Sequence, residues 1–231
     1  MPLPIYIFWW IVRILLIFAA IDMIRKNVGS KEVLQMCVNV FICFMFTLFK
    51  LFPKEKFIFS RLSFRFETIV IILNLVTTYI GSYLNWYFTV PSWDMIIHLL
   101  GAIAGVYAGY EVTVAANKNR KELAPIVGAI CGVGFCSWGA IFWEIFEFTL
   151  DQLTGSNIQH WQYIDKNFEI FTLTNPARYA LFDTMSDLIL GFVGSIVGGI
   201  IVFIWLAKRD RKAAATGQQA EVDALLSKKS S

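Results

Sequence analysis

Three apolar stretches of this chain carry acidic side chains at helical spacing, and one of them also carries a histidine. The sets are Asp94-x3-His98, Glu144-x2-Glu147-x3-Asp151 and Asp183-x3-Asp187. Carboxylate oxygens with one imidazole nitrogen suit a divalent cation, because oxygen-rich sites favour Mg²⁺, Mn²⁺ or Ca²⁺ and a single histidine also permits Zn²⁺ or iron. Six carboxylates in one place would repel one another unless a cation lay among them or several were protonated.

The spacings place each acidic set on one side of a helix, since residues three, four and seven positions apart share a helix face. A charged side chain inside a membrane span costs roughly 2.5–3.5 kcal/mol even on the lower insertion scales. Such residues therefore face the interior of a helix bundle and usually mark a site. The sequence predicts that three distant segments meet in one acidic pocket.

The expected roles of these residues follow from ligand chemistry. His98 and Asp94 are the predicted catalytic pair, with His98 as a ligand or general base and Asp94 orienting its ring. The chain has no P-loop, no HExxH motif and no Ser–His–Asp order, which favours metal-activated water over a covalent intermediate if the protein is an enzyme. The predicted metal ligands are Glu144, Glu147, Asp151, Asp183 and Asp187.

Some of these residues have simpler roles when each is taken singly. Asp94 and Asp183 begin their predicted helices, where a carboxylate caps free backbone N–H groups and interacts favourably with the helix dipole. Asp151 could lie in water beyond the end of its span, and His98 could be a hydrogen-bonded interior histidine. These roles leave the acidic residues inside the spans unexplained, namely Glu144, Glu147 and Asp187.

The elements that must position these residues are membrane-spanning helices. The chain has 231 residues, of which 57% are hydrophobic and 16% are charged, whereas soluble domains are about 45–50% apolar and about 25% charged. The Lys and Arg residues occupy short loops and a tail, as membrane topology alone would arrange them, so a nucleic-acid partner is not expected. The four cysteines fall in apolar stretches and are expected to be small buried residues without disulfides.

The predicted fold is an all-α, polytopic transmembrane bundle of about six spans, because a span needs roughly 20 apolar residues. Residues 1–207 form the membrane domain, and the polar tail from Lys208 to Ser231 is expected to be disordered. The N-terminal stretch lacks a charged n-region and a small-residue cleavage site, so we expect a retained span instead of a signal peptide. The predicted spans are Pro4–Ile24, Val33–Phe52, Phe66–Tyr87, Asp94–Ala116, Ala124–Leu150 and Asp183–Ala207.

The Lys and Arg residues orient this bundle with both termini in the cytoplasm, since positive residues concentrate in cytoplasmic loops. That orientation places Asp94, Asp151 and Asp183 at the extracytoplasmic ends of their spans, so all three acidic sets lie in one layer. The first loop, RKNVGSK, is the exception to the charge rule; if the first stretch did not span fully, the N terminus alone would move outside. Arg13 and Asp22 in that stretch are expected to snorkel to opposite membrane surfaces.

Glycines continue two of the acidic faces into the membrane. They are Gly101, Gly105 and Gly109 in the fourth span and Gly191, Gly194 and Gly198 in the sixth. Small residues at such spacing let helix backbones approach closely. We therefore expect the fourth and sixth spans to pack together below the acidic pocket.

The loop from Gln152 to Phe182 is long for a connection between helices. Its residues His160, Trp161 and Gln162 could form a lid over the pocket, and His160 could complete a ligand set. An equally good interpretation is an interfacial loop whose aromatic side chains anchor at the lipid head groups. The residues Tyr83–Tyr87 at the end of the third span are expected to be an interfacial aromatic belt.

The segments WDMIIHLLGAIAG, FWEIFEFTLDQLTG and LFDTMSDLILGFVGSIVGG together resemble the YjdF-like family of small bacterial inner-membrane proteins. That family has D-x3-H, W-E-x2-E-x3-D and D-T-x2-D followed by glycines, in this order. The chain is also distantly similar to VanZ-like membrane proteins, although it has E-x2-E where they tend to have one glutamate with a nearby glutamine. The resemblance covers Trp93 to Gly199, implies a multi-pass protein of the bacterial inner membrane and supplies no activity.

Three functions fit this pattern, and the lipid bilayer is the common partner. The first is a metal-dependent hydrolase or transferase that acts on a lipid or envelope-precursor head group at the outer leaflet. The second is a non-catalytic scaffold or sensor in which the metal holds helices together. The third is a cation- or proton-coupled transporter, which the apolar cytoplasmic halves of the fourth and sixth spans disfavour. The substrate, the metal and the oligomeric state stay open.

Overall fold

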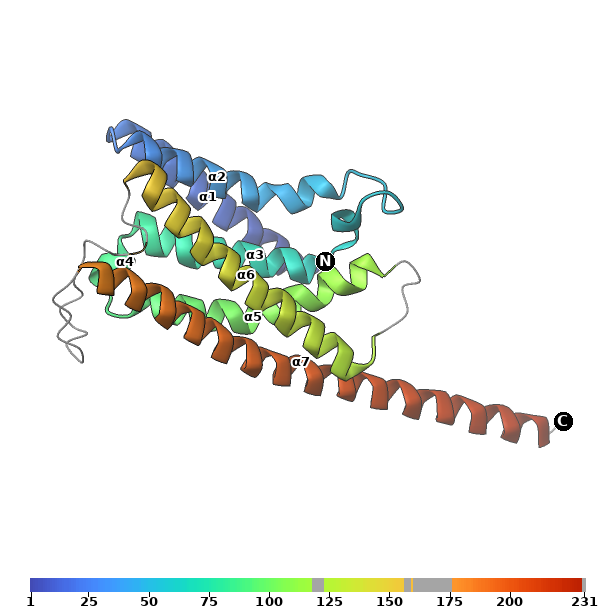
Figure 1. Ribbon diagram of the computed structural model, residues 1–231. Helices are drawn as coiled ribbons and strands as arrows, with labels where there is room; N and C mark the ends of the chain where they lie inside the picture. Colours follow the sequence, from blue (N-terminus) through green and yellow to red (C-terminus); the bar gives the residue numbers. More distant parts are fainter. Residues whose placement is uncertain (118–122, 156–158, 160–175, 230–231) are drawn as a thin grey trace.

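The computed structural model describes residues 1–117, 123–155, 159 and 176–229. It confirms the predicted all-α membrane bundle, because these residues form helices and no strand, and six of the helical stretches are long and apolar enough to cross a membrane. Successive spans run in opposite directions, so the N terminus and the C-terminal end of α7 lie toward the same end of the bundle (Figure 1). The side of the membrane on which that end lies stays a prediction.

Apart from the last helix, the helical elements extend slightly beyond the predicted spans or stop slightly short of them. The third span, Phe64–Tyr83, joins an α-helix to a π-helix, and η1 is a short 3₁₀ helix before it. The elements are α1 (Leu3–Arg25), α2 (Ser30–Phe49), η1 (Ile58–Arg61), α3 (Phe64–Asn74), η2 (Leu75–Tyr83), α4 (Trp86–Thr89), α5 (Trp93–Ala116), α6 (Pro125–Thr154) and α7 (Pro176–Lys229).

The N-terminal half of the bundle packs α1 against α2, α3 and η2. Its apolar core centres on Val12, Leu16, Met36 and Ile71, which are almost completely buried. The mean hydropathy of α1 is high over its whole length, and many of its apolar side chains stay exposed. In a membrane span such exposed apolar side chains face lipid, where burial brings no hydrophobic gain.

The C-terminal half consists of α5, α6 and α7, and glycines let their backbones approach closely. A Cβ atom added to Gly198 would lie 2.6 Å from the carbonyl oxygen of Ile103 in α5, and one added to Gly109 would lie 2.9 Å from the carbonyl oxygen of Gly132 in α6. The predicted packing of the fourth span on the sixth is therefore confirmed. The two glycine stripes do not face each other, however, because Gly194 and Gly198 of α7 contact α5 whereas Gly105 and Gly109 of α5 contact α6.

The third span ends in a π-helix that the sequence does not predict. In a π-helix each backbone hydrogen bond joins residues five positions apart, whereas in an α-helix it joins residues four positions apart. Such π-helical turns occur often at functional sites. Gly81 in η2 lies under the ring of Tyr87 and leaves room for it. Asn85 then takes a positive φ of 64° between η2 and α4, a conformation that asparagine tolerates better than most residues.

Helix α7 continues well beyond the predicted end of the sixth span. The polar composition after Lys208 predicts a disordered tail, whereas the helix extends to Lys229. The residues after Asp210 include many Ala, Lys, Gln, Glu and Leu, which all favour the helical conformation. These intrinsic preferences outweigh the polar composition on which the expectation of disorder rests.

Candidate functional site

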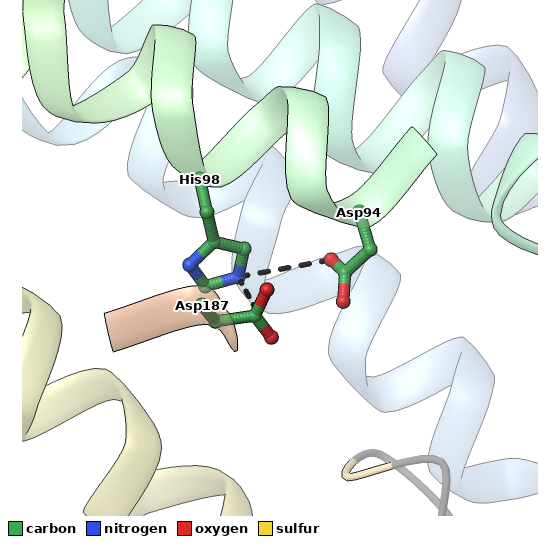
Figure 2. Close-up of side chains that lie close together, drawn as sticks. All are labelled: Asp94, His98 and Asp187. Atoms are coloured by element: carbon green, nitrogen blue, oxygen red, sulfur yellow. Dashed lines mark ion pairs between the residues drawn. The ribbon is translucent and has the colours of Figure 1, made fainter. Parts of the chain in front are cut away.

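The three acidic sets lie at one end of the C-terminal half of the bundle. Helix α5 begins there with Asp94 in its first turn, and α6 ends there at Thr154, three residues after Asp151. The next residue, Gly155, has a positive φ of 64°, which suits the end of a helix. Helix α7 passes beside them with Asp187 (Figures 1 and 2). Antiparallel crossings thus bring together residues that are far apart in the sequence.

Asp94, His98 and Asp187 converge on one point (Figure 2). The Nε2 atom of His98 lies 3.7 Å from Oδ1 of Asp94 and 3.8 Å from Oδ2 of Asp187. One possible ligand atom from each residue lies within 4.8 Å of the others. Both separations exceed hydrogen-bond length, so the three side chains face one another without being hydrogen-bonded together.

Asp187 is the most deeply buried member of this group, with 1% of its surface exposed. Neither of its carboxylate oxygens has a hydrogen-bond partner among the residues that the structure describes. A buried polar group without a partner costs about 1–3 kcal/mol, and more if it is charged. The position of Asp187 is therefore costly unless something positive or a donor binds there.

Both carboxylates approach the same nitrogen of His98. A carboxylate that orients a metal-bound or catalytic histidine bonds to the ring nitrogen opposite the reacting one. Asp94 and Asp187 instead lie on the Nε2 side together. This geometry fits a site in which both carboxylates and the imidazole bind the same ion. It fits less well the predicted catalytic pair, in which Asp94 orients the ring of His98.

Helix α6 turns its acidic face inward, as its spacing predicts. Glu144, Glu147 and Asp151 are 5%, 8% and 6% exposed, so Asp151 does not lie in water beyond the span. Glu144 shares a hydrogen bond with the hydroxyl of Thr184, which also accepts one from Nε2 of Gln159 at 2.9 Å. The backbone N–H of Gln159 donates to Asp151 Oδ2 at 3.0 Å. These hydrogen bonds connect α6 to α7, and they connect both helices to Gln159.

The acidic residues of α5, α6 and α7 lie close enough to act on one another. Tyr87, which precedes α5 and lies outside the spans, senses the same group: burial first, and then the charges of Asp94, Glu147 and Asp187, raise the pKa of its hydroxyl above the ordinary value. The carboxylates that act electrostatically on Asp187 are those of Asp94, Asp183, Glu144 and Glu147. These carboxylates therefore lie close together in the bundle. We define the acidic cluster as His98 together with five acidic residues, namely Asp94, Glu144, Glu147, Asp183 and Asp187.

The capping role considered for Asp183 is wrong. Helix α7 begins at Pro176, so Asp183 lies about two turns inside it, where the backbone N–H groups already have helical partners. Asp94 does lie in the first turn of α5, but the residue at the cap position is Ser92, with a positive φ of 57° and no capping hydrogen bond from its side chain. Oδ1 of Asp94 lies 3.7 Å from Nε2 of His98, and this contact links Asp94 to the cluster.

A groove between α6 and α7 opens beside the acidic cluster, with a volume of about 920 Å³. Glu144 belongs to both the groove and the cluster. The proposed lid residues His160, Trp161 and Gln162 lie outside the described residues, so that prediction stays untested.

Sequence reasoning missed a second buried ionic group, in the N-terminal half. Arg13 is 2% exposed and does not snorkel to the surface, because it donates to Glu67 at 3.1 Å and to the carbonyl oxygen of Cys43 at 2.9 Å. Glu67 also binds Lys50 and Thr47. The signal was present in the sequence, since Glu67 is the one acidic residue in the third span.

The fold and the cluster together define a class: a multi-pass helical membrane protein with carboxylates buried between its spans. The chain belongs to the family described as "Predicted membrane protein (DUF2238)", which it matches over residues 6–208. That match overlaps all six spans and includes every residue of the acidic cluster. The YjdF-like and VanZ-like resemblances stay predictions.

Comparison with individual proteins adds one relative. An uncharacterised protein of Thermotoga maritima is 27% identical over 125 residues, which is 53% of this chain and 54% of that protein. The chain thus spans about half the length of this curated relative. No solved structure matches the chain.

Proposed function

We propose that the protein binds a divalent cation at Asp94, His98 and Asp187 and uses it to hydrolyse or transfer a phosphate-linked head group of a membrane lipid or envelope precursor. The observation that carries the cation site is the convergence of both aspartates on Nε2 of His98. The two unpaired oxygens of buried Asp187 support it. A cation would supply the partner that these oxygens need.

The spacing of the donor atoms fits this proposal. Mg²⁺, Mn²⁺ and Zn²⁺ bind oxygen or nitrogen at about 2.0–2.2 Å, so neighbouring ligands lie about 3 Å apart and opposite ligands about 4 Å apart. The two separations of 3.7 and 3.8 Å fall between these values. Two aspartates and a neutral histidine also balance the charge of a divalent ion, and Glu144, Glu147 and Asp183 offer further oxygens.

The proposed chemistry follows from this donor set. A bound divalent ion activates water near neutral pH and stabilises the charge that develops on phosphate oxygens. The chain's own residues would orient the lipid phosphate and exclude bulk water, and one of the remaining carboxylates, such as Glu147, would accept the proton. The Lys and Arg distribution favours the extracytoplasmic face for this reaction.

The first test measures metal binding. Detergent-purified wild type is expected to hold Mg²⁺ or Mn²⁺ stoichiometrically, as measured by mass spectrometry and titration calorimetry. Loss of an outer-shell partner alone lowers metal affinity about 10–100-fold, so Asp187→Asn should lower it at least as much. The matched control is Glu111→Gln, which makes the same change at the other end of α5, where Glu111 accepts a hydrogen bond from Tyr107.

The second test measures turnover on a lipid phosphate in nanodiscs, with head-group release as the readout. Release should require Mg²⁺ or Mn²⁺, and Asp187→Asn should abolish it while Glu111→Gln retains it. Stoichiometric metal that raises the melting temperature without any release would point to the scaffold function instead. Metal content that Asp187→Asn leaves unchanged would exclude the proposed site.

A further inference from the structure

The groove between α6 and α7 has an apolar wall that faces the bilayer. Ile145 and Phe148 of α6 are 55% and 54% exposed, and Leu181 of α7 is 61% exposed. These residues belong to two candidate membrane spans, so their open sides face hydrocarbon. The groove therefore opens sideways into lipid.

The long axis of the groove follows α6. Its lining extends from Ile141 to Gln152, which corresponds to roughly 16 Å at 1.5 Å per residue. Leu188 of α7 lines the groove between Asp187 and Gly191, which lies beside Ala140 of α6, whereas Asp151 and Gln159 lie near the end of the bundle. The volume of about 920 Å³ is in the range of pockets that bind whole small ligands.

One wall of the groove is polar and belongs to the acidic cluster. Glu144 directs its carboxylate between α6 and α7, where one oxygen shares a hydrogen bond with Thr184. The other oxygen, Oε2, is buried and has no partner among the described residues. A ligand in the groove would thus place apolar atoms along Ile145 and Leu188 and its polar group beside Glu144.

We propose that this groove binds the acyl or isoprenyl chain of a membrane lipid and delivers the lipid's phosphate sideways from the bilayer to the acidic cluster. The inference rests on the proposed function in one respect, which is the cation. Carboxylates repel a phosphate, so an anionic lipid is complementary to this site only when a divalent ion lies between them. The substrate class is therefore a lipid phosphate that never leaves the membrane, and its binding depends on the cation.

The experiment uses the full chain in nanodiscs with a phosphatidic acid whose acyl chain carries a photoreactive diazirine, in the presence of Mg²⁺. Leu188→Trp fills the groove and should lower crosslinking to α6 and α7 by about tenfold or more, because the indole takes the space that the lipid chain would occupy. The matched control is Ile189→Trp, because Ile189 is 57% exposed on the same helix and does not line the groove. That variant should crosslink like wild type.

Two further measurements separate this inference from the proposed function. Chelation by EDTA should lower crosslinking of phosphatidic acid but not of an uncharged diacylglycerol probe, and both Trp variants should retain their Mg²⁺. Equal crosslinking of Leu188→Trp and Ile189→Trp would overturn the groove whatever the metal content. If wild type held no metal but Leu188→Trp still lost crosslinking, the lipid-binding groove would stand. The cation site, and the dependence of lipid binding on the cation, would then be refuted.

Discussion

Glu67 and Asp187 are both buried to 99%, yet their surroundings differ. The carboxylate of Glu67 is hydrogen-bonded to Arg13, Lys50 and Thr47, so its charge is fully compensated. The carboxylate of Asp187 instead lies 3.8 Å from Nε2 of His98, beyond hydrogen-bond distance. Compensation within the protein indicates a structural group, whereas a buried carboxylate with unbonded oxygens indicates a ligand site.

This contrast predicts how the Arg13–Glu67 pair contributes to stability. Glu67→Leu leaves Arg13 buried without its partner, and removing one member of a buried pair costs about 3–5 kcal/mol of unfolding free energy. Arg13→Met keeps much of the packing of Arg13 on Trp9 and Phe44 and should cost less, because Lys50 still pairs with Glu67. Reversible denaturant unfolding in detergent measures both.

The double variant Arg13→Met/Glu67→Leu serves as the control, because replacing a whole buried pair by apolar residues is often nearly neutral. It should be more stable than the sum of the single changes predicts. Additive effects would mean that the two side chains act independently.

At the scale of the helices, the inward faces were predictable and the exact contacts were not. The spacing of Glu144, Glu147 and Asp151 alone determines that they share a face of α6, and the cost of charge in lipid turns that face inward. Spacing does not determine which neighbour a glycine meets, because that depends on how far each helix is rotated. Nor does it reveal the π-helix η2, in which Gly81 lies under the ring of Tyr87.

The contact of α7 with α5 gives a prediction at this scale. A Cβ atom on Gly194 would lie 2.5 Å from the carbonyl oxygen of Leu99, and backbone cannot move aside as a flexible side chain can. Gly194→Ala should therefore lower the unfolding free energy by about 1–3 kcal/mol. Gly139→Ala, also within a span but with nothing within 4 Å of the added atom, should leave it unchanged or raise it by up to about 1 kcal/mol. Equal effects of the two changes would contradict close packing between α5 and α7.

For the whole molecule, composition and apolar run lengths were enough to predict six spans, because bilayer thickness dictates their length. The convergence of three acidic sets also followed, since alternating spans place Asp94, Asp151 and Asp187 at one end. The Arg13–Glu67 pair could not be assigned in the same way. Its partners are 54 positions apart, and no local spacing connects them.

The orientation of the bundle can be tested by fusing reporter proteins to the C terminus of the full chain and to chains truncated in a loop between two spans. Green fluorescent protein fused at the C terminus or after Asn117 should fluoresce, because the Lys and Arg distribution places both positions in the cytoplasm. Alkaline phosphatase fused after Gly155 should be active, since that position is at the opposite end. The reverse pattern would place the acidic cluster on the cytoplasmic side.

The buried Arg13 also has a consequence for biosynthesis. When α1 leaves the ribosome, its guanidinium group has no counter-ion, and an isolated arginine near the centre of a nascent span opposes release into lipid by about 2.5–3.5 kcal/mol or more. Glu67 is synthesised 54 residues later. The first three spans are therefore expected to leave the translocon together, so that Arg13 enters the lipid already paired with Glu67.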